Sequence, residues 1–384
     1  MMKELSLDRR AKMGLSALTI FAALVLLAVS TRTYAPRTGT LVSTGIPEAA
    51  RFSHTATLLQ NNKVLIAGGM QRNGVWLDSA EIYDPARGRF LPAGKMLSRR
   101  AGAMATLLPN GKVLIAGGAD GSGKSLRTTE IYDPDSNVFT PGPDMLSPRA
   151  HGVAVPLRSG KVLIAGGCAQ GDNDRLASAE LYDPLSGAFS WTGSMHVRRG
   201  AFNAVALADG KVLVTGGMSG GELPDVTVEA SAEIYDPATG RFTLTSPMSV
   251  PRYKHGMALL KDGRVLVIGG QSEGAFGPRL ASTEIYNPAT RSFTHGPEMK
   301  YARYKLIQGV VTLNDGQVLV AGGADQPEMY DPEENLFVPV AGPKLEGFYF
   351  STATTLGNGT VLLLDGYGRH PMAGAVRQAW LWKP

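Results

Sequence analysis

Lys112–Gly118 reads Lys-Val-Leu-Ile-Ala-Gly-Gly, and Thr129–Pro134 reads Thr-Glu-Ile-Tyr-Asp-Pro. Similar stretches recur along the whole chain. The turn residues that end the apolar runs are Gly68-Gly69, Gly117-Gly118, Gly166-Gly167, Gly216-Gly217, Gly269-Gly270, Gly322-Gly323 and, in degenerate form, Asp365-Gly366. They recur about every 50 residues, and a fixed period of this length indicates one supersecondary unit that is repeated.

Each repeat contains four predicted strands. In one of them, Ala103–Leu108 and Lys112–Ala116 flank the hairpin signal Asn110-Gly111. Thr128–Tyr132 alternates in character, and Val138–Thr140 follows it after an Asp-Pro turn. Four short strands in a repeat of about 50 residues are typical of a β-propeller blade.

The two ends of the repeat region predict how the ring closes. The last repeat has strands near Ser351–Leu356, Thr360–Leu364 and Val376–Trp382 but no fourth strand, whereas the chain opens with a spare fourth strand, Thr40–Ser43. Placing this strand beside Val376–Trp382 completes the last blade and leaves no long open edge. We predict an all-β, seven-bladed propeller of four-stranded antiparallel blades over residues 38–384. Six blades are the alternative, because the seventh repeat is weak.

These motifs resemble the kelch repeat, which combines paired glycines, a tyrosine in the third strand, and a Met-x-x-x-Arg stretch before the next blade. An aromatic residue in the fourth strand completes the pattern, at Phe90, Phe139, Phe189, Phe242, Phe293 and Phe337. The resemblance covers residues 39–382 and extends to the propeller domain of galactose oxidase. It implies the fold and says little about function.

Residues 1–37 are predicted to be separate from the propeller. Met13–Thr31 is uncharged, mostly apolar and about long enough to cross a bilayer as a helix. Arg9, Arg10 and Lys12 precede it, so the positive-inside rule places the repeats outside the cytoplasm. We favour a single-pass membrane anchor, because the run is longer than the apolar core of a usual signal. A cleaved secretory signal is the alternative, which gives a secreted or periplasmic protein.

The net charge of +5 is concentrated at the N-terminus, where residues 1–37 carry six basic and two acidic residues, or +4. The nearly neutral remainder is a poor match for nucleic acid, whose binding depends on neutralising phosphates. Cys168 is the only cysteine, which excludes an intrachain disulfide and a four-thiolate zinc site. We predict a monomer that binds a protein or carbohydrate ligand and has no metal or cofactor.

An arginine recurs shortly before the first strand in six of the seven repeats, and Phe348 takes its place in the last. The six positions are Arg51, Arg100, Arg149, Arg199, Arg252 and Arg303. Blade connections and the variable loops after the second strand emerge on one face, where function is expected. Two interpretations are open for these arginines at the channel mouth. They bind an anion or polyol, or each one bridges blades by hydrogen-bonding backbone carbonyls, which we favour because the pattern follows the repeat.

Other polar and aromatic residues are predicted around the same mouth. The first candidates for ligand binding are His151, His255 and Tyr253, and the further ones are Tyr301, Tyr304, Lys254, Lys305, Tyr349 and Phe202. Mixed aromatic and polar groups on a concave face suit a carbohydrate or a peptide. Packing of several of these side chains against neighbouring blades is equally open.

Two motifs are interpreted as loop sequence only. Gly118–Ser125 matches the P-loop pattern, but a predicted strand follows it, whereas a phosphate loop must open a helix. Gly171–Arg175 offers oxygen ligands for calcium but lacks the later bidentate glutamate. Neither motif therefore predicts a ligand.

Two functions remain as hypotheses. The first is a membrane-tethered, non-enzymatic module that binds a protein or glycan through its loop face. The second is a carbohydrate-active enzyme, either a copper-radical oxidase like galactose oxidase or a sugar mutarotase. The resemblance implies that an oxidase needs a Cys–Tyr thioether, a second tyrosine and two histidines, here Cys168, Tyr253, His151 and His255. The adjacent Tyr-His pair of those oxidases is absent from this chain.

Overall fold

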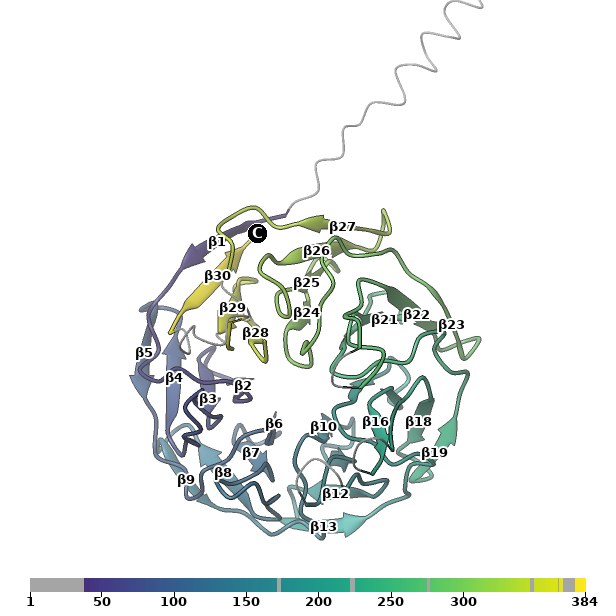
Figure 1. Ribbon diagram of the computed structural model, residues 1–384. Coiled ribbons are helices and arrows are strands. Elements are labelled where there is room, and N and C mark those ends of the chain that lie inside the picture. The colour runs from purple at the N-terminus through teal and green to yellow at the C-terminus, as the bar shows by residue number, and fades with distance from the viewer. Residues whose placement is uncertain are drawn as a thin grey trace, which may run out of the picture. The chain divides into compact units, whose positions relative to one another are not determined.

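The computed structural model describes residues 38–170, 174–221, 225–274, 277–345, 349–364, 366–368 and 377–384, all of them in one compact unit, Thr38–Pro384. Seven four-stranded antiparallel sheets in this part of the chain form the blades of a propeller (Figure 1). The first strand of each blade faces the central channel and the last forms the rim. The prediction of seven blades is thus confirmed, and the six-bladed alternative is wrong.

The blades follow one another along the chain. Blade 1 consists of β2 (Thr55–Leu58), β3 (Val64–Ala67), β4 (Ala80–Asp84) and β5 (Arg89–Pro92). Blade 2 consists of β6 (Met104–Leu107), β7 (Val113–Ala116), β8 (Thr129–Asp133) and β9 (Val138–Pro141). Blade 3 consists of β10 (Val153–Pro156), β11 (Val162–Ala165), β12 (Ala179–Asp183) and β13 (Ala188–Trp191). Blade 4 consists of β14 (Asn203–Ala206), β15 (Val212–Thr215), β18 (Ala232–Asp236) and β19 (Arg241–Leu244).

The remaining blades have the same order of strands. Blade 5 consists of β20 (Gly256–Leu259), β21 (Val265–Ile268), β22 (Thr283–Asn287) and β23 (Ser292–His295). Blade 6 consists of β24 (Val310–Thr312), β25 (Val318–Val320), β26 (Glu328–Asp331) and β27 (Leu336–Pro339). Blade 7 consists of β28 (Thr352–Thr355), β29 (Val361–Leu364), β30 (Ala379–Lys383) and β1 (Thr40–Ser43).

The N-terminal strand closes the ring as predicted. β1 pairs with β30 in antiparallel register, with Thr40 opposite Lys383 and Leu41 opposite Trp382. Leu41 and Trp382 are both buried in the core of blades 6 and 7. The indole Nε1 of Trp382 also donates a hydrogen bond to the carbonyl oxygen of Thr38 at 2.8 Å. The first and last residues of the propeller are therefore joined by both backbone pairing and packing.

The repeated sequence explains the repeated geometry. The second strand of each blade is buried on both faces, which is why it is apolar throughout. In the glycine pair that follows, Gly117 has φ +62°, and a Cβ there would lie 2.2 Å from the carbonyl oxygen of Arg149. A side chain is therefore excluded by both conformation and space. The tyrosine of the third strand packs on the phenylalanine of the fourth, as in Tyr132–Phe139 with ring centroids 4.8 Å apart.

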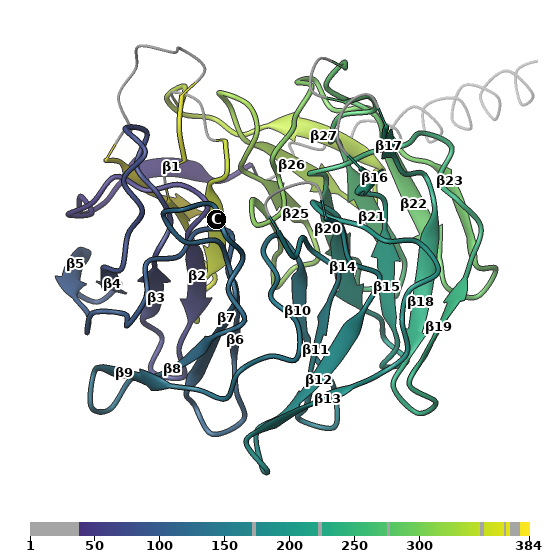
Figure 2. The same ribbon diagram turned by 60° about the horizontal axis from the view of Figure 1, so that its bottom comes forward.

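The two edges of the blades differ, as Figure 2 shows. The loops after the second strands lie at one edge, where the connection between β15 and β18 contains the hairpin of β16 (Met218–Gly220) and β17 (Val226–Val228). The turns between third and fourth strands lie at the other edge. The Gly118–Ser125 loop closes as a turn, with Asp120 accepting hydrogen bonds from the backbone of Ser122 and Lys124, and strand β8 follows it.

The predicted anchor lies outside the described residues and stays a prediction. Among the residues that the structure does describe, no helix is long and apolar enough to span a membrane.

Candidate functional site at the channel mouth

The six repeated arginines are buried and paired with glutamates. In blade 3, Arg149 Nη1 donates to the carbonyl oxygens of Gly166 (2.9 Å) and Ser178 (3.1 Å), and Nη2 donates to Glu180 Oε1 (2.6 Å). The same ion pair occurs in six blades, as Arg51–Glu81, Arg100–Glu130, Arg149–Glu180, Arg199–Glu233, Arg252–Glu284 and Arg303–Glu328. Burial lowers the pKa of Arg149, and the Glu180 carboxylate partly offsets that effect.

Each glutamate also holds the segment that connects two blades. Glu180 accepts hydrogen bonds from the backbone N–H groups of Leu146 (2.7 Å) and Ser147 (3.0 Å), which precede Arg149 in that segment. The guanidiniums thus point into the blades and bind internal carbonyls and carboxylates. This arrangement supports the interpretation of the arginines as structural bridges. The glutamate partners were not predicted, although their fixed place before the repeated tyrosine was a signal.

The residue two positions after each of these arginines adopts a left-handed conformation. With the equivalent residue of blade 7, the set is Ser53, Gly102, His151, Ala201, Lys254, Lys305 and Phe350, and their φ angles lie between +51° and +66°. A positive φ is unfavourable for any residue except glycine, so the surrounding structure must enforce it. We call these seven residues the mouth ring.

Backbone hydrogen bonds run around the mouth ring from blade to blade. The N–H group of Gly102 donates to the carbonyl oxygen of Ser53 (2.9 Å), and that of His151 donates to Gly102 (3.0 Å). Ala201 donates to His151 (3.3 Å), and Lys254 donates to Ala201 (2.8 Å). Beyond Lys254 the series continues through the N–H group of Leu306, which donates to Lys254 (3.0 Å), and that of Phe350, which donates to Lys305 (3.4 Å). These bonds hold the backbone of the mouth ring in place. Only the two lysines of the mouth ring are alike. The residues of the blades, in contrast, follow the sequence repeat closely.

Aromatic rings surround the ammonium group of Lys305. Its Nζ lies 4.7 Å from the ring centroid of Tyr367, 4.8 Å from those of Tyr304 and Phe350, and 5.6 Å from that of Tyr349. It also donates a hydrogen bond to the Tyr367 hydroxyl. Cation–π attraction accounts for this position of a lysine among apolar rings.

Two more cations share this wall of the mouth. Lys254 Nζ lies 5.3 Å from the Phe350 ring centroid, and Arg279 Cζ lies 5.1 Å from that of Tyr349, whose hydroxyl accepts a hydrogen bond from Arg279. Burial, together with repulsion from Lys254 and Arg279, lowers the pKa of Lys305 to about 7. Blades 5 to 7 thus present a positively charged aromatic wall.

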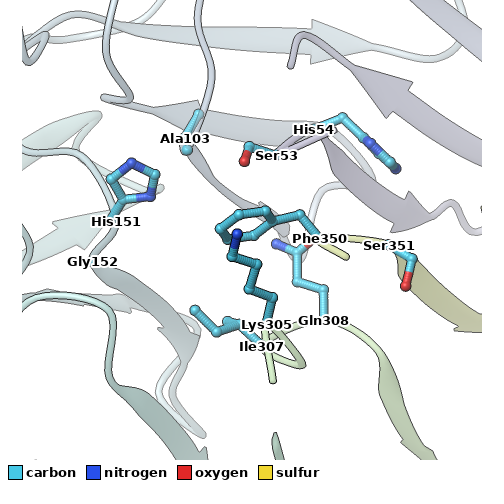
Figure 3. A pocket seen from close by; sticks show the side chains of 11 residues that line it. Ser53, His54, Ala103, His151, Gly152, Lys305, Ile307, Gln308, Phe350 and Ser351 are labelled. Carbon is cyan, nitrogen blue, oxygen red and sulfur yellow. The ribbon is translucent and has the colours of Figure 1, made fainter. Parts of the chain in front are cut away.

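Blades 1 to 4 present many small or sulfur-containing side chains, and a cavity of about 430 Å³ opens there. Its lining includes Met70, Trp76, Cys168 and Met218, and it reaches Lys254 on the opposite wall. A second cavity, of about 70 Å³, adjoins it through residues common to both linings. Figure 3 shows this smaller space, with the Lys305 ammonium beside the Phe350 ring and facing His151 and Ser53.

The structure separates the three first candidates. His151 belongs to the mouth ring and lines both cavities. His255 is fully buried, its Nε2 lies 2.8 Å from the Thr215 hydroxyl, and burial lowers its pKa to about 3. Tyr253 is buried too and donates a hydrogen bond to Gln271 Oε1 at 2.9 Å. His255 and Tyr253 are therefore held by contacts within the wall, and neither lines the two cavities.

Several residues of the site were not predicted. Phe350, Tyr367, Arg279 and Trp76 all lie at or beside the cavities. Phe350 could have been found by counting two residues beyond the arginine-equivalent position of the last repeat. Arg279 and Trp76 lie in loops of variable sequence, which cannot be aligned from one repeat to the next.

The described residues do not assemble a metal site. Among them, no group of three or more His, Cys, Asp or Glu side chains comes together in a way that could hold a metal ion. Cys168 and His151 line the same cavity, but His255 is turned away toward Thr215. The donor set that a copper-radical oxidase needs is therefore not brought together in this part of the chain.

Comparisons with known proteins agree with this architecture. The Kelch motif matches residues 102–146, 199–249 and 258–300. Among solved structures, a fungal alcohol oxidase of the AA5 family in complex with copper is similar, with a TM-score of 0.70 and 16% sequence identity over 92% of this chain and 76% of the other. No curated protein sequence matches the chain. The chain therefore contains Kelch motifs in three regions and folds as a seven-bladed β-propeller, to which the solved structure is similar in fold.

Proposed function

We propose that this propeller is a binding module that holds an acidic carbohydrate at the channel mouth. The observation that carries the proposal is the convergence of Lys254, Lys305 and Arg279 on one aromatic wall beside a cavity. The charged groups that shift the pKa of Lys305 are both cations. An anion placed between these groups would relieve their mutual repulsion and gain charge-assisted hydrogen bonds.

The surroundings of the cations favour a sugar as the body of the ligand. The aromatic rings of the cavity lining, Trp76, Phe52 and Phe350, offer apolar faces for the C–H groups of a sugar ring, and the Trp76 indole N–H is a donor for its hydroxyls. A cavity of about 430 Å³ suits a sugar unit or the end of a chain. A protein partner would instead need a much larger complementary surface, so we place the glycan before the protein ligand.

The enzyme hypotheses find less support in the site. At 16% identity the likeness to the fungal copper oxidase concerns the fold. Among the described residues no group of three or more His, Cys, Asp or Glu side chains could hold a metal ion, and we propose no oxidation step. A mutarotase that works through the repeated arginines would need free guanidiniums, whereas those of Arg149 and its equivalents are bound to glutamates inside the blades.

We also propose a cellular location for the propeller, which rests on the sequence alone. Met13–Thr31 would tether the propeller to the cell membrane, with the mouth outside the cytoplasm. A tethered receptor for acidic glycans would meet its ligands there, in the cell envelope or beyond it.

Calorimetric titration of the full chain tests the function. The probes are trigalacturonate and its methyl ester, which keeps the sugar rings and removes the charges. We expect the acid to bind and the ester to bind about tenfold or more weakly, because charge-assisted hydrogen bonds are lost. Equal binding of acid and ester, or no binding of either, would refute the proposal. Binding of hexaglutamate without trigalacturonate would make the ligand a peptide.

The variant pair Lys254→Met and Arg279→Met should abolish the preference for the acid. Lys261→Met is the matched control, because Lys261 belongs to the same blade but lies in the turn between β20 and β21, at the far end of β20 from Lys254. The control should bind both probes as the unmodified protein does.

A further inference from the structure

We infer that Lys305 is a nucleophilic amine that captures the carbonyl group of a small aldehyde or ketone as an imine, and that Lys254 and Arg279 select carbonyl compounds with an anionic group. The second part rests on the proposed anion-binding function. The first part rests on the surroundings of the amine alone.

The amine is both enclosed and reachable. The Nζ atom lies among four aromatic rings, with centroids between 4.7 and 5.6 Å away. Lys305 also lines the smaller cavity together with His151, Gln308 and Phe350, and its ammonium end faces the open space (Figure 3). A small molecule in this cavity would meet the nitrogen atom directly.

Two neighbouring cations favour the uncharged amine. A lysine in water carries a proton at neutral pH in all but roughly one molecule in a thousand. Burial, with repulsion from Lys254 and Arg279, lowers the pKa of Lys305 to about 7, so that a large share of the molecules holds a free electron pair. Desolvation next to another cationic group is a recognised way to activate a lysine toward carbonyl compounds.

A proton relay accompanies the amine. Burial raises the pKa of Tyr367, so its hydroxyl keeps its proton near neutral pH, and this hydroxyl is hydrogen-bonded to Lys305 Nζ. It can take a proton from the nitrogen while it gives its own to an oxygen atom beside it. The Tyr367 hydroxyl therefore ends each such transfer in the state in which it began.

The reaction balances without a further reagent. The nitrogen electron pair attacks the carbonyl carbon, the C=O π pair moves to oxygen, and one proton passes from nitrogen to oxygen through Tyr367 to give a carbinolamine. A second proton then passes from nitrogen to the hydroxyl, which leaves as water while the C=N bond forms. One amine and one carbonyl thus give one imine and one water. The nearby charges of Lys254 and Arg279 would hold a carboxylate on the same molecule.

Reductive trapping on the full chain tests the inference. The protein is incubated at neutral pH with glyoxylate and sodium cyanoborohydride, and the product is mapped by peptide mass spectrometry. We expect one carboxymethyl group per chain, on Lys305, entering about tenfold or more faster than on any exposed lysine, because those are almost fully protonated. Label spread evenly over exposed lysines would overturn the inference.

Two variants separate chemistry from fold. Lys305→Arg keeps the positive charge but lacks the nucleophile, and it should lose the label. Lys261→Arg should keep it. An unchanged rate and site count in Lys305→Arg would overturn the inference, and a melting curve shows that the variant is folded.

Two further probes distinguish this inference from the proposed function. Glycolaldehyde carries the carbonyl without the charge, and glycolate carries the charge without the carbonyl. If glycolaldehyde labels Lys305 as fast as glyoxylate, the amine acts as inferred and anion selection is refuted. If glycolate binds but glyoxylate leaves no label on Lys305, the anion site stands and the nucleophilic amine is refuted.

Discussion

The Nη2 atom of Arg149 lies 2.6 Å from Oε1 of Glu180, and neither side chain is exposed to solvent. The pair sits where the connection from blade 2 enters blade 3, and Glu180 also binds the backbone of that connection. Its equivalents occupy the same place in five other blades. A buried pair of this kind specifies geometry, because each charge would be costly without the other.

Replacement of Arg149 by alanine should therefore lower stability and spare ligand binding. We expect the free energy of unfolding to fall by about 3–5 kcal/mol, because the Glu180 carboxylate would be left buried without its partner. Urea denaturation measures the change. The double replacement Arg149→Met with Glu180→Met should cost less than Arg149→Ala. Full stability with lost trigalacturonate binding would restore a ligand role for the repeated arginines.

The closing strand can be tested through Leu41. Its replacement by alanine should cost about 2–4 kcal/mol, because it removes buried methyl groups that pack with Trp382 in the core of blades 6 and 7. Thr40→Ala, at an exposed position of the same strand, is the control and should change stability by less than about 0.5 kcal/mol. Deletion of residues 38–45 should lower the melting temperature further, and an unchanged value would contradict closure by β1.

Two buried histidines should make the protein sensitive to acid. Burial lowers the pKa of His54 and of His255 to about 3, from 6.5 for an ordinary histidine. Between these values the unfolded chain binds more protons than the folded protein, so stability is full above pH 6.5 and falls as the pH drops toward 3. The double variant His54→Gln with His255→Gln should show a shallower fall in urea midpoint between pH 6 and 4. His295→Gln, at an exposed position, should keep the original slope.

Ligand binding should depend on the protonation of Lys305. Because its pKa is lowered to about 7, the residue is mostly charged at pH 6 and mostly neutral at pH 8. We expect trigalacturonate to bind more tightly at pH 6, and Lys305→Met to bind more weakly with a flatter pH profile. Calorimetry at both pH values measures this, with Lys261→Met as control. Imine trapping should change in the opposite direction, since it needs the neutral amine.

The fold was accessible from the sequence because it depends on local, repeated signals. Apolar runs such as Val113–Ala116, the glycine pairs and the Asp-Pro turns each have one physical explanation, and their period fixes the number of blades. The missing strand of the last repeat and the spare strand at Thr40–Ser43 then determined the closure. Each of these inferences used residues close together in the chain, except for the closure, which used the match between one missing strand and one spare strand.

The site was less accessible because it depends on direction and on distant neighbours. The recurrence of the arginines favoured a structural role but did not identify their carboxylate partners, such as Glu180 for Arg149. Lys305 and Tyr367 are 62 residues apart, and the ring brings them together. Tyr367 belongs to the weakest repeat and Arg279 to a variable loop. Neither residue could therefore be aligned with equivalent positions in the other repeats.

The mouth ring has a consequence for how such a protein can acquire new specificity. Its backbone is held in place by hydrogen bonds between blades, while its side chains border the cavities and take little part in the cores. The positions other than Gly102 can therefore be exchanged one at a time without rebuilding a blade, provided that residues branched at Cβ are avoided where φ is positive. At Gly102 a Cβ would lie 2.3 Å from the His151 ring, so these two positions must change together. The propeller separates the part of the chain that must be kept from the part that is free to diversify, as an antibody framework does for its loops.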